Sequence, residues 1–133
     1  MLSQIVYISS ARQAVSASDL QQILAVSRRN NARDGLSGLL FFDGKRFLQA
    51  LEGEPDAVAA AYKRIGADPR HSGLVTLSKR EVATREFGDW AMASRGSPAH
   101  DDLMLKRVEL LVANAAPAVQ ATFNSFAQVR RAA

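Results

Sequence analysis

The sequence predicts an α+β fold with a ferredoxin-like βαββαβ core, extended by a fifth strand and two C-terminal helices. Apolar residues recur alternately at strand spacing and at helix spacing, and an Asp-Gly pair separates two apolar runs where this fold needs a hairpin. The length of 133 residues, with 47% hydrophobic and 23% charged residues, suits one globular domain. We therefore expect two helices on one face of a mixed sheet and the two C-terminal helices on the other.

The first strand and the first helix are both marked by local patterns. Residues 2–9 read as a strand in which odd and even positions face opposite sides of the sheet. The patterns S-x-x-D at residues 16–19 and S-x-x-Q at residues 18–21 resemble capping boxes, so a helix should begin near residue 18. Its inward stripe runs on to Asn31.

The next two strands are predicted by a hairpin signal. Asp43-Gly44 lies between LSGLLFF and KRFLQALEG, which favours a two-residue turn centred on this pair. Such a turn would pair Gly38 with Gln49. Because glycine has no side chain, that register predicts a gap opposite Gln49, in which another group has room.

The remaining elements follow from prolines and apolar spacing. Pro55 suits the first position of a second helix, which should stop before Pro69. Residues 74–83 are expected to form the fourth strand and residues 90–93 a short fifth. Two more helices should begin near residues 98 and 117 and cover the sheet face that the first two helices leave open.

Composition argues against several functional classes. The chain has no cysteine, which excludes disulfides and thiolate metal sites and favours the cytoplasm. Two histidines without cysteine are too few for a zinc site. No apolar run approaches the about 18 residues of a membrane span, and the N-terminus has no basic region typical of a signal peptide. The net charge of +4 is dispersed, whereas nucleic-acid-binding surfaces cluster their basic residues.

A polar side chain in an apolar setting marks the candidate site. Gln49 is flanked on its own strand face by Phe47 and Leu51. A buried primary amide without partners costs about 1–3 kcal/mol, and the phenol of Tyr7 is a candidate partner. Asn31 closes an otherwise apolar helix stripe.

Arg64 and Asp68 add a guanidinium and a carboxylate spaced i, i+4 on the second helix. Together, these groups predict a cleft for a flat, apolar ligand with carbonyl and N–H groups at its rim. Each residue also has a structural explanation: a satisfied core amide or a solvent-facing edge for Gln49, simple packing for Tyr7, and a surface ion pair for Arg64 and Asp68. These residues alone therefore predict a ferredoxin-like domain with a candidate pocket.

Five motifs in order give a family resemblance. They are IVYIS around Tyr7, NNARDGLSGLLFF, FLQALEG around Gln49, DPRHSG, and REFGDWAM at residues 85–92. This combination resembles the BLUF family, sensors of blue light using flavin, over residues 2 to about 95.

The resemblance implies a noncovalently bound flavin between the two core helices, usually FAD, with FMN or riboflavin as alternatives. It implies a hydrogen-bond switch made by Tyr7 and Gln49, with either Trp90 or Met92 as the switchable residue on the fifth strand. The cofactor-binding positions that it implies are Tyr7, Ile23, Asn30, Asn31, Leu40, Phe47, Gln49, Arg64, Asp68, His71 and Met92.

The function expected from the resemblance is a blue-light photoreceptor and not an enzyme. Residues 1–96 would form the flavin-binding core, and residues 97–133 a helical extension of the same compact domain that offers an output surface. We expect a separate signalling partner, no nucleic acid, no membrane and a homo-oligomer. The alternative is a light-independent small-ligand binder or an enzyme that uses the same scaffold.

Overall fold

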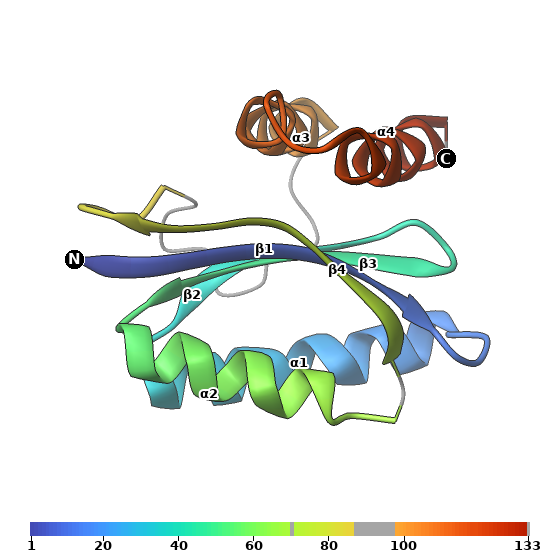
Figure 1. Ribbon diagram of the computed structural model, residues 1–133. Helices are drawn as coiled ribbons and strands as arrows, with labels where there is room; N and C mark the ends of the chain where they lie inside the picture. Colours follow the sequence, from blue (N-terminus) through green and yellow to red (C-terminus); the bar gives the residue numbers. More distant parts are fainter. Residues whose placement is uncertain (70, 87–97, 133) are drawn as a thin grey trace.

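The computed structural model describes residues 1–69, 71–86 and 98–132 and confirms the ferredoxin-like α+β fold. In Figure 1, helices α1 and α2 cover one face of the sheet, and α3 and α4 cover the other. The elements in chain order are β1 (Leu2–Ala11), α1 (Ala17–Asp34), β2 (Ser37–Phe42), β3 (Arg46–Gly53), α2 (Pro55–Gly66), β4 (His71–Val82), α3 (Pro98–Leu111) and α4 (Pro117–Ala132).

The four described strands are arranged in the order β2-β3-β1-β4. All three pairings between them are antiparallel, because the β2–β3 hairpin reverses the chain and β1 lies between two strands that run opposite to it. The four described strands therefore form an antiparallel sheet, and the mixed sheet that we expected would need a parallel strand in addition to these four. The fifth strand that we expected at residues 90–93 lies outside the described residues.

Helix α1 begins and ends as its sequence signals predict. Ser16 is the N-cap, its hydroxyl oxygen accepts from the Asp19 N–H at 3.0 Å, and the Asp19 carboxylate accepts from the Ser16 N–H at 3.1 Å. At the other end, Gly35 takes a left-handed conformation with φ of 69°, and its N–H donates to the carbonyl of Asn31. This termination fixes Asn31 in the last turn of the helix.

The β2–β3 turn differs from the prediction. The Asp43 carboxylate accepts from the backbone N–H groups of Lys45, at 2.9 Å, and Arg46, at 2.7 Å. Asp43 and Arg46 therefore close the turn, and its two central residues are Gly44, with φ of 104°, and Lys45. A side-chain hydrogen bond that competes with the Asp-Gly turn moved the turn by one residue.

The shifted turn changes the strand register by two residues. Leu40 is opposite Gln49, and Gly38 is opposite Leu51. The predicted gap opposite Gln49 is therefore wrong, although a shift of two leaves every side chain on its expected face. Glycine at position 38 serves close packing instead, because a Cβ there would lie 1.8 Å from the carbonyl oxygen of Ala50.

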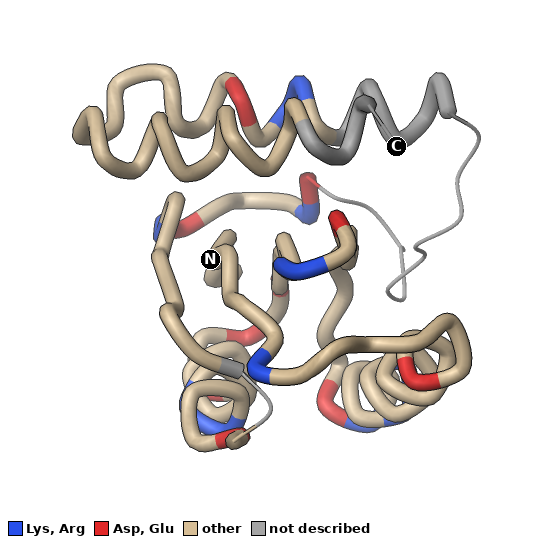
Figure 2. The backbone as a smooth tube through the Cα atoms, turned by 90° about the vertical axis from the view of Figure 1, so that its right-hand side faces the viewer, with Lys and Arg blue, Asp and Glu red and all other residues tan. Residues whose placement is uncertain are grey.

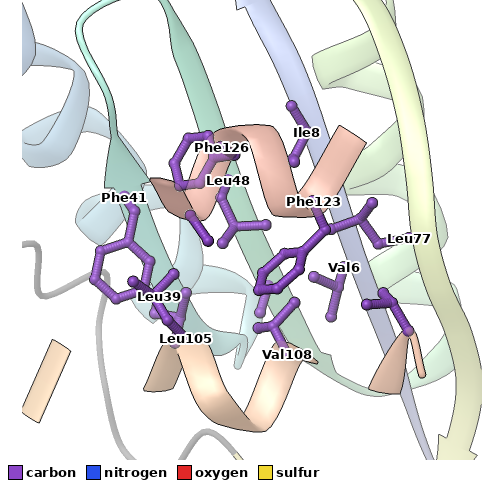
Figure 3. Packing of buried hydrophobic residues seen from close by; sticks show 13 residues of the cluster. Val6, Ile8, Leu39, Phe41, Leu48, Leu77, Leu105, Val108, Phe123 and Phe126 are labelled. Carbon is purple, nitrogen blue, oxygen red and sulfur yellow. The ribbon is translucent and has the colours of Figure 1, made fainter. Parts of the chain in front are cut away.

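Alternation along β1 divides the core between the two sheet faces, as expected. Ile5 and Tyr7 pack toward α1 and α2, whereas Val6 and Ile8 pack toward α3 and α4. Figure 3 shows side chains of all four strands meeting those of the C-terminal helices. The buried hydrophobic residues described on the face that α3 and α4 cover are Val6, Ile8, Leu39, Phe41, Leu48, Ala50, Leu77, Leu105, Val108, Val112, Phe123, Phe126 and Ala127.

A buried polar cluster on the same face was not predicted. Gln4 and Glu52 are both 0% exposed, and the Gln4 amide donates to the Glu52 carboxylate at 2.8 Å. Arg80 donates to the Gln4 carbonyl oxygen at 3.0 Å, and the backbone N–H of Glu86 donates to Glu52 at 2.7 Å. Arg107 of α3 donates to the backbone carbonyl of Glu86. The cluster thus ties three strands to the segment after β4 and to α3.

Charged residues are scattered over the described chain, with both signs interspersed along it (Figure 2). Within the described part, the structure has no helix with the length and apolarity needed to cross a bilayer. The same residues include no group of three histidine or acidic side chains placed to hold a metal ion.

Candidate functional site

A cavity of about 160 Å³ lies between α1, α2 and the sheet. Its walls include eight of the cofactor-binding positions expected from the sequence: Ile23, Asn30, Asn31, Leu40, Phe47, Gln49, Arg64 and Asp68. A neighbouring cavity of about 440 Å³ shares Ile23 and Phe47 with it and extends along residues 11–15. These two side chains therefore separate spaces that together reach the size of small-molecule sites, about 300–1,000 Å³.

Tyr7 and Gln49 are the buried polar pair of the site. They are cross-strand partners in the β1–β3 ladder, and the Tyr7 hydroxyl donates to Oε1 of Gln49. Only 1% of Tyr7 and 7% of Gln49 is exposed. The phenol that the sequence suggested as a partner for Gln49 is thus its partner, and the amide nitrogen remains the donor end of the side chain.

The environment of Tyr7 keeps its phenol neutral. Burial raises the pKa of Tyr7 far above its ordinary value, and the neighbouring phenol of Tyr62 adds a smaller contribution in the same direction. A phenolate in this position would lose its hydration without gaining a cation. Tyr7 is therefore a hydrogen-bond donor over the whole physiological pH range.

Asn31 presents an unsatisfied donor to the cavity. The residue is 4% exposed, and its Nδ2 has no hydrogen-bond partner within the described residues. Leaving such a group unpaired costs about 1–3 kcal/mol, so a buried orphan donor needs an explanation. A ligand carbonyl in the cavity would provide the missing acceptor.

The site fits a flavin on this observation. A flavin ring has a polar edge with carbonyl and N–H groups, which match the amides of Asn31 and Gln49. Its apolar faces match the walls that Ile23, Leu40 and Phe47 provide. These five residues would hold the ring by its edge and its faces.

Arg64 and Asp68 also line the cavity. Arg64 forms an ion pair of 3.6 Å with Asp34, which joins the C-terminal turns of α1 and α2. Arg33 also holds Asp34, and the hydrogen bond between them lowers the pKa of that carboxyl. Because these groups are solvated, the pairs contribute little to stability, but they bring the two helix ends together beside the cavity.

Four predicted residues are not among the described residues that line the cavity. Tyr7 lies behind its wall and reaches it only through the hydrogen bond to Gln49. His71 is the first residue of β4, where its backbone pairs with Ala11, and its side chain is not described. Trp90 and Met92 lie outside the described residues. The choice between the two therefore stays a prediction.

Sequence reasoning missed one neighbour of Tyr7. Tyr62 of α2 was not among the expected site residues, yet its ring centroid lies 5.4 Å from that of Tyr7. The helical spacing gave its inward direction but carried no information about which strand residue it would meet.

Comparisons with known proteins agree with this geometry. Residues 2–93 match the BLUF family, described as sensors of blue-light using FAD. The photoactivated adenylate cyclase subunit beta of Euglena longa is 34% identical over 94 residues, which are 70% of this chain and 11% of that protein. The blue light- and temperature-regulated antirepressor BluF of Escherichia coli (strain K12) is 32% identical over 92 residues, 69% of this chain and 23% of that protein. The chain thus spans a minor part of these curated relatives.

A solved structure extends the similarity to the C-terminal helices. The dark-state structure of BlrB, a BLUF protein, superposes with a TM-score of 0.70 at 28% identity and covers 96% of both chains.

Proposed function

Since the chain belongs to the BLUF family, the sensors of blue-light using FAD, we propose that it reports light through a hydrogen-bond switch between Tyr7, Gln49 and the flavin. The domain is a flavin-based blue-light sensor and not a catalyst, as its family membership indicates. The observation that supports the switch is the buried hydrogen bond from Tyr7 to Gln49 at the wall of the cavity.

The chemistry of the switch follows from these two side chains. A bound flavin that has absorbed blue light is a strong oxidant. Tyr7 is a buried neutral phenol that can supply an electron and a proton, and Gln49 can relay the proton because its amide both donates and accepts. Return of the electron and a proton to Tyr7 would restore the neutral phenol and leave Gln49 in a changed orientation or tautomer. Its altered bond to the ring edge would shift the absorption slightly to the red.

The output would begin with the same amide. Because Gln49 is buried, its changed donor pattern has to be satisfied again nearby. We propose that the segment carrying Trp90 and Met92 responds, with either Trp90 or Met92 as the residue near Gln49. Residues 97–133 would then pass the change to a partner. The packing of α3 and α4 on the sheet supports this route.

The partner is proposed to be a separate effector protein. Relatives that contain this domain include an adenylate cyclase subunit and an antirepressor, so the domain serves different downstream effectors. We further propose a cytoplasmic location because the chain has no cysteine, and no binding to nucleic acid because its charge is dispersed. A homo-oligomer is proposed on the family resemblance alone. The assignment of FAD rather than FMN or riboflavin follows the family.

Difference absorption tests the function directly. Purified protein should be yellow, and its flavin bands should shift to the red under blue light and recover in darkness. A flavin-free protein that binds another small ligand, or catalyses a reaction without light, would support the alternative of a ligand-binding or enzymatic ferredoxin-like domain.

A further inference from the structure

Tyr62 makes a specific contact with the photoactive tyrosine. Its ring centroid lies 5.4 Å from that of Tyr7, with 57° between the ring planes, which is a favourable tilted arrangement of two aromatic rings. The Tyr62 hydroxyl is hydrogen-bonded to the Thr76 hydroxyl at 2.8 Å. Tyr62 is therefore held at two points, by an aromatic ring on β1 and by a hydroxyl on β4.

An irregularity in β4 makes this arrangement possible. Val6 pairs with Ser78 and Tyr7 pairs with Thr76, so Leu77 is an extra residue in the ladder. Without this bulge, Leu77 would be opposite Tyr7, and Thr76 would turn to the other face. The bulge instead leaves Leu77 in the core under α3 and α4 and gives Thr76 to Tyr62. Bulges that redirect a side chain are common beside functional sites.

Tyr62 also separates Tyr7 from an open cavity. A hollow of about 630 Å³ beside α2 is lined by Tyr62 and Thr76, among others, and not by Tyr7. Tyr7 is 1% exposed although its neighbour Tyr62 is only half-buried. The Tyr62 ring is thus part of the wall that keeps water away from the Tyr7 phenol on the side of α2.

We propose that Tyr62 is a positioning residue for the light switch, which holds the Tyr7 phenol on Gln49 and excludes water from it. The inference rests on the proposed function only for the role of Tyr7 in the photocycle. In the dark state, a water molecule that reached Tyr7 would compete with Gln49 as the acceptor. After illumination, it would offer alternative partners to the rearranged amide and so ease its return.

The test compares ring-free and ring-retaining variants of the flavin-loaded full chain. Tyr62→Leu removes the ring, and Tyr62→Met is a second ring-free variant that keeps good helix propensity, for use if the first does not fold. Tyr62→Phe keeps the ring and removes only the bond to Thr76. We expect dark recovery to be about two- to tenfold faster in the ring-free variants, the rate change that corresponds to the loss of one aromatic pair. The rate of dark recovery in Tyr62→Phe should stay within about twofold of the parental rate, because the ring contact is kept.

A dark measurement provides an independent readout. Alkaline titration of tyrosine absorbance, taken as the difference from the same variant with Tyr7→Phe, should show Tyr7 ionising at lower pH in the ring-free proteins and near the parental pH in Tyr62→Phe. A ring-free variant that is merely less stable, with parental titration and recovery, would overturn the proposal. If the parent shows no red shift at all, the proposed switch fails, and the titration alone decides the role of Tyr62.

Discussion

The hydroxyl of Tyr7 donates to Oε1 of Gln49 directly across the β1–β3 ladder. Both side chains are held by paired backbones and are almost completely buried, so the bond needs little further ordering to form. Substitution of either residue also removes the hydrogen-bond partner of the other. The consequences can be separated by changing one atom group at a time.

Tyr7→Phe should bind flavin and lose the reversible red shift. The substitution removes the hydroxyl and leaves the aromatic packing, so the cavity keeps its shape. Absorption spectra of the purified variant before and after blue light check this expectation. A photocycle of parental amplitude in Tyr7→Phe would remove Tyr7 from the mechanism.

Gln49→Leu should also bind flavin without a red shift, for a different reason. Leucine can neither accept from Tyr7 nor donate to the ring edge. Gln49→Met is the matched variant, because it keeps the length of the side chain but has neither the amide donor nor the amide acceptor. The relay requires both functions, so Gln49→Met should be inactive as well. A surviving shift in either variant contradicts the relay.

Asn31→Leu should have opposite effects on the flavin-free and the flavin-loaded protein. Without flavin, the change removes a buried donor that has no partner in the part of the chain that the structure describes, so the free energy of unfolding should be unchanged or higher. With flavin, it removes a hydrogen bond to the ring edge and should weaken binding by about 1–3 kcal/mol, or roughly 5- to 150-fold in Kd.

Urea unfolding of the flavin-free protein and flavin titration by fluorescence measure the two effects. Asn30→Leu is a useful comparison, because Asn30 lies next to Asn31 and is more exposed. A large loss of stability of flavin-free Asn31→Leu would indicate that the amide has a structural partner, contrary to the assignment.

The raised pKa of Tyr7 predicts a specific loss of stability in alkali. Burial opposes ionisation in the folded state, whereas the unfolded chain ionises near the ordinary value of about 10. Below that pH, both states are neutral and the contribution of Tyr7 is fully present. Above it, the unfolded state is favoured because it alone releases the proton.

Unfolding free energies measured between about pH 9 and 11, one unit of pH on either side of the ordinary tyrosine value, test this sign. The parent should lose stability above about pH 10 more steeply than Tyr7→Phe, which has no proton to lose at this position. Parallel pH profiles for the two proteins would show that Tyr7 is hydrated in solution.

Glu52→Ala should destabilise the protein by about 1–3 kcal/mol, because the change removes the acceptor of the Glu86 N–H and leaves the Gln4 amide with only its weaker bond to the Glu86 carboxylate. Glu81→Ala on β4 is the control, since Glu81 is exposed and substitutions at such positions are usually within about 0.5 kcal/mol of neutral. Chemical denaturation of both variants provides the comparison. Equal stabilities would show that the cluster does not hold the segment after β4 to the sheet.

Local signals predicted the elements and their faces. The capping box at Ser16 and the proline at position 55 placed helix starts to within a residue or so. Alternation along β1 assigned Tyr7 to the face of the sheet that α1 and α2 cover. These features depend on residues within one or two turns of each other, where the backbone geometry is nearly fixed by the residue type.

The tertiary structure decided which side chains meet. The carboxylate of Asp43 set the hairpin turn, which replaced the expected Gly38 by Leu40 opposite Gln49. The extra residue Leu77 placed Thr76 on the face of Tyr62.

The sequence by itself determined an α+β scaffold with a phenol and an amide on the same face of the sheet, and its motifs gave the resemblance to a family of light sensors. Only the folded chain decided that Tyr62 covers the phenol, that Asn31 has a donor without a partner among the described residues, and that Gln4 meets Glu52 across 48 residues. Contacts between distant residues depend on register and on bulges, which shift by one or two residues for a free-energy difference as small as a single hydrogen bond, about 1 kcal/mol. Local patterns do not encode differences of that size, whereas the packed sheet selects one register because every buried side chain has to fit at once.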